Sequence, residues 1–109
     1  MANLVILESA QRELEEIAQI HRNLVGPHSA RTITDLILDT LSHVEMFPLS
    51  GHIPRDKELR NGGYRYVIAG KYISMYRLIG EEVYVYHIAH GARNYPTLFK
   101  RLLKEDCLD

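Results

Sequence analysis

The sequence has no tryptophan, a single cysteine and no long apolar run. Cys107 has no partner for an internal disulfide, so we expect it to be incidental. No apolar stretch approaches the roughly 18 residues that a membrane span needs, and the start MANLVILESAQRE carries neither a basic flank nor a small-residue cleavage site. We therefore expect a cytoplasmic protein without a membrane partner.

Several motifs that would announce a chemistry are also missing. There is no glycine-rich phosphate loop, no serine or cysteine nucleophile motif and no pair of carboxylates on an extended face. His87 and His90 are spaced like half of a metal site, but they lie on an expected strand, where residues three apart point to opposite faces. We expect neither metal nor cofactor, and the residues alone leave open whether the protein is an enzyme.

The formal net charge of −1 conceals an uneven distribution. Residues 1–50 carry three basic and seven acidic side chains, whereas residues 51–104 carry ten basic and four acidic ones. The second half would therefore suit an anionic partner. Alternatively, lysines such as Lys57, Lys100 and Lys104 only solvate loops and a helix face.

Length and composition indicate one globular domain over residues 1–109, with 46% hydrophobic and 25% charged residues. A short apolar run over Asn3–Leu7 predicts a buried strand. Apolar residues at helical spacing follow from Ala10 to Val25, up to Gly26-Pro27, and again from about Ser29 to Phe47, up to Pro48. These two segments predict a helical hairpin.

The composition then changes twice along the chain. Residues 49–63, rich in glycine and proline, predict a connecting loop without regular structure. The period of apolar residues next becomes two, which predicts an antiparallel meander of three strands: Tyr64–Ala69, Tyr72–Leu78 and Val83–Ala89. After Gly91 we expect a short last helix, capped by Asn94 and with Pro96 in its first turn.

The predicted fold class is α+β: an N-terminal strand, an α-helical hairpin packed on a twisted antiparallel sheet, and a short C-terminal helix. The first strand joins this sheet at an edge or in its centre. Because the hairpin covers one face of the sheet, we expect the other face or its rim to carry the function.

Alternation along the last strand separates the roles of its histidines. His87 shares a face with Val83, Val85 and Ala89, which predicts a core residue. His90 falls at the rim, where it either bonds the backbone or works in binding or proton transfer. The tyrosines from position 64 onward could stack on bases, but packing on a half-buried sheet explains them more simply.

Three arginines lie near strand ends: Arg65, Arg77 and Arg93. We expect them to gather near one edge of the meander, where guanidinium forks can grip phosphate or carboxylate. The alternative is that each pairs with a local acid, for example Arg77 with Glu81 or Glu82.

The element order, with PLSG at 48–51, GGYR at 62–65, GKYISMYRL at 70–78 and VYVYHIAHGARNYPTLF at 83–99, resembles the RelE/ParE superfamily of toxins from type II toxin–antitoxin (plasmid stabilisation) modules. The resemblance covers nearly the whole chain up to Phe99. It implies a small toxin held by a cognate antitoxin that folds on binding, in a homodimer or a heterotetramer with the antitoxin.

The superfamily has two branches: one cuts mRNA on the ribosome without metal, and the other poisons DNA gyrase. The RNA-cutting branch places lysines and arginines on the exposed sheet face, and often a tyrosine in the last helix. Arg65 and Arg93 fall at such basic positions here. Apolar or phenyl side chains instead occupy three others, Val67, Ile73 and Phe99.

PLSG and GKYISMYR resemble the ParE branch more closely, so the resemblance favours a gyrase inhibitor whose target is bound by Arg65, Arg77, His90 and Arg93. In the alternative, an mRNA endonuclease, Arg65 and Arg93 stabilise the phosphate while His90 transfers a proton. A further alternative is a protein that binds its antitoxin but is no longer toxic.

Overall fold

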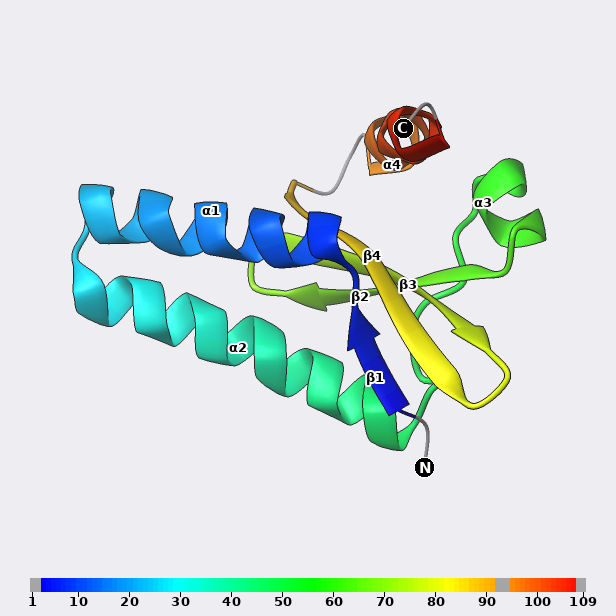
Figure 1. Cartoon of the computed structure of the whole chain (residues 1–109), viewed down its shortest axis with the longest axis horizontal. Helices are drawn as coiled ribbons and strands as arrows, with labels where there is room; N and C mark the ends of the chain where they lie inside the picture. The colour runs from blue at the N-terminus through cyan, green and yellow to red at the C-terminus, as the bar shows by residue number, and fades with distance from the viewer. Residues whose placement is uncertain (1–2, 92–94, 108–109) are drawn as a thin grey trace.

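The computed structural model describes residues 3–91 and 95–107. Its elements follow the order β1 (Asn3–Ile6), α1 (Glu8–Leu24), α2 (Pro27–Met46), α3 (Lys57–Asn61), β2 (Tyr64–Ala69), β3 (Tyr72–Ile79), β4 (Glu82–His90) and α4 (Tyr95–Cys107) (Figure 1). The predicted α+β class, helical hairpin and meander are thus confirmed. None of the described helices is long and apolar enough to cross a membrane.

The four strands form one sheet in the order β1-β4-β3-β2. Strands β2, β3 and β4 are the predicted antiparallel meander. Strand β1 lies at the edge and runs parallel to β4, with Leu4 beside Val83, so the sheet is mixed rather than purely antiparallel. The crossover through the α1–α2 hairpin allows this parallel pairing, because parallel neighbours need a long connection.

Helices α1 and α2 pack on one face of the sheet. The core between them is formed by buried apolar side chains from both layers, among them Ile17, Ile37, Leu41, Tyr76 and Val85. The tip of the hairpin extends beyond the sheet (Figure 1). There Leu24 and Val25 are 80% and 75% exposed, although both belong to the apolar residues at helical spacing in the first predicted helix.

The opposite face is partly covered, which corrects the expectation that it stays open. The segment predicted to be irregular contains a helix, α3. This helix forms because the Asp56 side chain caps it by accepting the Leu59 N–H at 3.1 Å. Leu59 of α3 and Phe99 of α4 pack with Ile73 and Met75 of the sheet in a second core. Helix α4 has 13 residues, longer than the short helix predicted.

The start of α4 partly matches the prediction. Pro96 lies in its first turn, as expected. The expected cap, Asn94, falls outside the described residues.

Strand β4 contains an irregularity that changes which way its side chains point. Met75 pairs with His87 while Tyr76 pairs with Val85, so Tyr86 is an extra residue without a partner on β3. A bulge of this kind breaks the alternation of side chains. His87 is buried, as predicted. It shares the α4 face with Ala89, as predicted, but the prediction that Val83 and Val85 lie on that face too is wrong.

Candidate functional site

The members of the predicted cluster that the structure describes, Arg65, Arg77 and His90, do not come together. The register places Tyr64 opposite Arg77 at one end of β3 and Tyr72 opposite His90 at the other end. Tyr72 and Arg77 are five positions apart on the strand, a distance of about 17 Å. Antiparallel strands reverse direction, so β4 ends far from the start of β2. Arg93, which follows His90 in the chain, falls outside the described residues.

Arg65 and Arg77 share an end of the sheet but lie on opposite faces. Arg65 is paired with Tyr76, and Arg77 with Tyr64, and side chains of cross-strand partners lie on the same face. Arg65 is on the side of the α1–α2 hairpin, where its Nη1 donates to the carbonyl oxygens of Leu49 at 3.2 Å and Gly51 at 3.1 Å. The expectation that these two arginines share a site is therefore wrong.

Tyr76 fixes the segment from Pro48 to Gly51 by hydrogen bonds. The hydroxyl of this fully buried tyrosine donates to the Pro48 carbonyl at 2.7 Å and accepts the Gly51 N–H at 3.0 Å. Burial raises the pKa of Tyr76, so the hydroxyl keeps the proton that it donates. With Arg65, this tyrosine explains why the sequence PLSG forms an ordered connection after α2.

Arg77 is enclosed by tyrosines on the face that carries α3 and α4. Its Nε and Nη2 donate to the Tyr86 hydroxyl at 3.0 and 2.6 Å, and Nη1 donates to the Gly62 carbonyl at 3.4 Å. Its guanidinium carbon lies 4.9 Å from the centroid of the Tyr64 ring and 5.1 Å from that of Tyr86. We call Tyr64, Arg77 and Tyr86 the Arg77 cluster.

No carboxylate among the described residues lies within 4.0 Å of the Arg77 guanidinium, so the alternative of an ion pair with Glu81 or Glu82 is wrong. Burial lowers the pKa of Arg77, but the bond to Tyr86 and the nearby phenol groups outweigh it and raise the pKa overall. A half-buried guanidinium that contacts aromatic rings and a hydroxyl, and no carboxylate, can still bind an anion.

His90 is exposed at the end of β4, at the rim as predicted. Its ring stands edge-on to that of Tyr72, with the centroids 5.4 Å apart. The Tyr72 hydroxyl bonds His21 Nε2 at 2.9 Å, and His21 Nδ1 bonds the Ser29 hydroxyl at 3.1 Å. His21 lies 51 positions from Tyr72, so no local pattern in the sequence indicates this chain of contacts.

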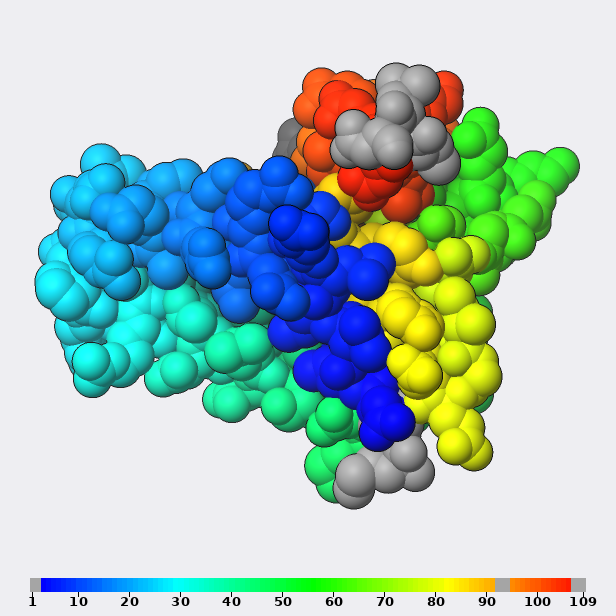
Figure 2. All heavy atoms as spheres, viewed as in Figure 1, coloured from blue at the N-terminus to red at the C-terminus, as the bar shows by residue number. Residues whose placement is uncertain are grey.

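Beside His90 lies a groove of about 800 Å³. It runs between α1, the turn from β2 to β3, and α4, and its apolar walls include Ile20, Leu24, Ile33 and Leu98. Figure 2 shows α1 and α4 as separate parts of the surface, with part of β4 exposed below α4.

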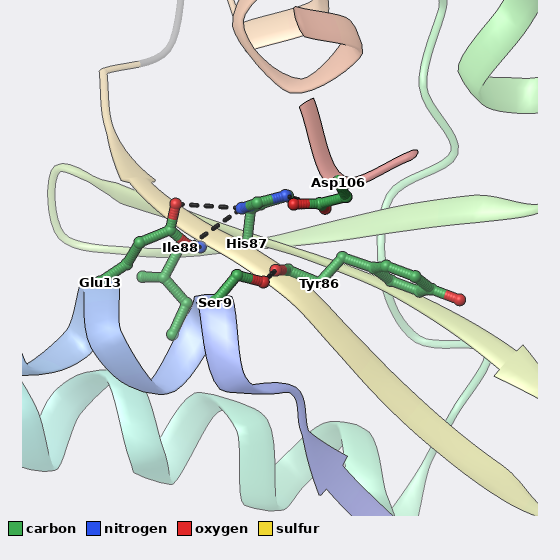
Figure 3. A network of polar contacts seen from close by, with 6 residues as sticks. All are labelled: Ser9, Glu13, Tyr86, His87, Ile88 and Asp106. Atoms are coloured by element: carbon green, nitrogen blue, oxygen red, sulfur yellow. Dashed lines mark hydrogen bonds and ion pairs between the residues drawn. The ribbon is translucent and has the colours of Figure 1, made fainter. Parts of the chain in front are cut away.

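His87 joins three elements that are distant in sequence (Figure 3). Its Nδ1 lies 3.0 Å from the Glu13 carboxylate of α1, and its Nε2 lies 2.8 Å from the Asp106 carboxylate of α4. These partners are 74 and 19 positions away, so no local spacing could have revealed them. In the part of the chain that the structure describes, no group of three His, Cys, Asp or Glu side chains could hold a metal ion.

Comparisons with known proteins agree with this fold. The chain resembles a structure described as the chromosomal ParDE TA system from P. aeruginosa, with a TM-score of 0.71, 18% identity, and coverage of 84% of this chain and 98% of that one. It also resembles the toxin–antitoxin complex RelBE2 from Mycobacterium tuberculosis, with a TM-score of 0.54, 20% identity, and coverage of 82% and 96%.

At these identities the structural similarity shows the fold alone. A search of curated proteins finds no significant match. The family described as "ParE toxin of type II toxin-antitoxin system, parDE" matches residues 4–95. The chain therefore belongs to the ParE toxin family of type II toxin–antitoxin systems, within the RelE/ParE superfamily.

Proposed function

We propose that this toxin arrests growth by inhibiting DNA gyrase, as its resemblance to the ParE branch implies, and that it is not a ribosome-dependent mRNA endonuclease. The observation that carries the proposal is the packing of three side chains. Ile73 and Phe99 are 2% and 0% exposed in the second core, and Val67 packs against the hairpin core. These are the positions where the RNA-cutting branch places cations or a tyrosine.

The positions of the described polar residues support binding over RNA cleavage. Cleavage through the 2′-hydroxyl needs cations, a base and an acid around one phosphate. Arg65 bonds two backbone carbonyls, Arg77 lies on the other face, and His90 lies at the opposite end of the sheet. A broad surface with separate contacts suits a large protein target better than a single scissile phosphate.

In this proposal the target contacts fall into two groups. The Arg77 cluster supplies a cation for an acidic group of the target at one end of the sheet. His90 supplies a second contact at the other end. Arg93 is also proposed as a target contact, but it lies outside the described residues. Arg65 contributes indirectly, by fixing the segment from Pro48 to Gly51.

Induced expression in a host cell tests the proposal, with breakage of chromosomal DNA and cleavage of ribosome-bound transcripts measured together. We expect broken DNA with intact transcripts, and inhibition of purified gyrase. Arg77→Ala should weaken this inhibition by about tenfold or more, because a charge-assisted contact is worth roughly 1.5–3 kcal/mol. His90→Ala should lower affinity without abolishing a chemical step.

The outcomes separate the alternatives. Transcript cleavage with intact DNA, lost by orders of magnitude in Arg93→Ala, would establish the endonuclease with Arg65, Arg93 and His90 as its catalytic residues. Normal growth despite folded protein in the cell would favour a non-toxic antitoxin-binding protein. Arg77→Lys is the matched control for Arg77→Ala. It keeps the positive charge but loses the planar guanidinium fork, so the comparison separates the effect of charge from that of geometry.

We also propose a cognate antitoxin as partner, since both similar structures come from toxin–antitoxin systems. The groove supports this proposal because Ile20 and Leu24 on its wall are 54% and 80% exposed. A segment that folds on binding could lay an apolar face there. Co-expression with the product of the adjacent gene, followed by light scattering, tests the partner and distinguishes a homodimer from a heterotetramer.

A further inference from the structure

His87 is 2% exposed, yet both of its ring nitrogens face carboxylates. A neutral imidazole carries one N–H and can donate to only one of them, which would leave a lone pair directed at the other carboxylate. The imidazolium carries two N–H groups and can donate to both. The contacts at 3.0 Å to Glu13 and 2.8 Å to Asp106 therefore fit the protonated ring.

We propose that the buried His87 imidazolium is a proton-dependent latch that holds the C-terminal end of α4 on the sheet. Figure 3 shows the ring lying between α1 and the last turn of α4. The two carboxylates are not equivalent. Glu13 also accepts the Ile88 N–H at 3.0 Å, so β4 holds it whatever the state of His87.

Asp106 is the partner that can be released. Its side chain is 42% exposed, against 21% for Glu13, and among the described residues its contact with His87 is the ion pair that joins this end of α4 to the sheet. A second ion pair of α4 within the described ranges lies nearer its start, where Lys100 donates to Asp56 at 2.8 Å. Losing the His87 contact should therefore loosen the last turns of α4 and leave its first turns docked.

The charges around His87 determine the direction of the pH response. Glu13 faces it from α1 and Asp106 from α4, while its neighbour across β3 is the uncharged Met75. Burial lowers the pKa of His87, but the bonds and charges of Glu13 and Asp106 outweigh burial and raise the pKa above 6.5. The stabilisation of the closed latch is fully present below about pH 6.5, the ordinary pKa of the ring. As the pH rises from there to the raised pKa of the closed state, the equilibrium constant for opening increases by up to about tenfold per pH unit.

Opening would expose part of the second core without unfolding the protein. The last turns of α4 contribute Leu102 and Leu103, which pack against the second core. The hairpin core contains no residue of α4, so it should persist while α4 opens. This inference concerns the fold of the chain and does not depend on the proposed action on gyrase.

Amide hydrogen exchange on the full chain between pH 6 and 9, corrected for intrinsic rates, tests the latch. We expect protection in residues 101–106 to fall several-fold with rising pH, while protection in α2 stays constant. Asp106→Asn should lower protection in α4 at pH 6 and abolish its dependence on pH. Asp56→Asn is the matched control: it breaks the other ion pair of α4 and should keep the dependence on pH.

Two results would overturn the latch. One is constant protection of α4 in the unmodified protein across this range of pH. The other is a nitrogen chemical shift of the His87 ring that shows a neutral imidazole at pH 6. Both measurements use purified toxin, so they remain informative even if gyrase is not the target.

Discussion

Gly51→Ala is expected to damage the connection after α2 through a single added methyl group. A Cβ on Gly51 would lie 2.7 Å from Cε1 and 2.9 Å from Cζ of the Tyr76 ring, and closer still to its hydroxyl oxygen. Tyr76 is fully buried and its hydroxyl makes two hydrogen bonds to this same segment. The ring therefore cannot move aside without losing its packing in the core and the hydrogen bonds of its hydroxyl with Pro48 and Gly51.

The cost has two sources. Overpacking a well-packed site costs about 1–3 kcal/mol. Displacing the hydroxyl also weakens the bonds to Pro48 and Gly51, at about 1 kcal/mol each. Together these give a loss of about 3–5 kcal/mol in the free energy of unfolding. Gly80→Ala is a control, since a Cβ there meets no atom within 4 Å and only its positive φ of 63° adds strain.

Urea denaturation of Gly51→Ala, Tyr76→Phe and the double variant measures this coupling. Tyr76→Phe alone should cost about 1–3 kcal/mol, because the Gly51 N–H and the Pro48 carbonyl lose their partner. The double variant should be less destabilised than the sum of the two single variants, since the closest clash disappears with the hydroxyl. Strict additivity, or a Gly51→Ala protein as stable as the unmodified one, would refute the reasoning.

Two further changes test other parts of the fold. Gly70→Ala should cost about 1–2 kcal/mol in thermal unfolding, because its φ of +61° is left-handed, and Gly70→Asn should recover part of the loss. The hydrogen bond from Lys100, and then the bond from the Leu59 N–H, lower the pKa of Asp56 below 3.8. Asp56→Asn should therefore be less stable than the unmodified protein at neutral pH, and urea titrations should show the difference disappearing as the pH falls through that lowered value.

Much of the architecture was predictable because it follows from local patterns. Apolar periods of two and of 3.6 residues located the meander and the hairpin within a few residues of their bounds. Helix α3 was missed because one cap, Asp56, and one buried side chain, Leu59, outweigh the glycine and proline around them. The place of β1 depends on long-range pairing with β4, which no local pattern reveals.

The two failures at the site have different causes. The short turn at Gly70 and Lys71 pairs Ala69 with Tyr72, and the same register pairs Tyr64 with Arg77. That Arg65 and Arg77 lie on opposite faces could therefore have been derived from the sequence. The bulge at Tyr86 could not, because nothing in VYVYHIAH marks which residue lacks a partner. His87 consequently faces α4 instead of the hairpin core.

The partners of each cation decide which variants are informative about toxicity. Arg65 bonds the Leu49 and Gly51 carbonyls, so replacing it frees the segment that Tyr76 also holds, and lost toxicity could reflect lost structure. Arg77 bonds the Tyr86 hydroxyl and faces two rings, and its backbone contact, with the Gly62 carbonyl, is long at 3.4 Å. Arg77→Lys therefore keeps the positive charge while removing the planar fork. A loss of gyrase inhibition at unchanged stability in Arg77→Lys would therefore assign the contact to the geometry of the guanidinium, which the same result at Arg65 could not do.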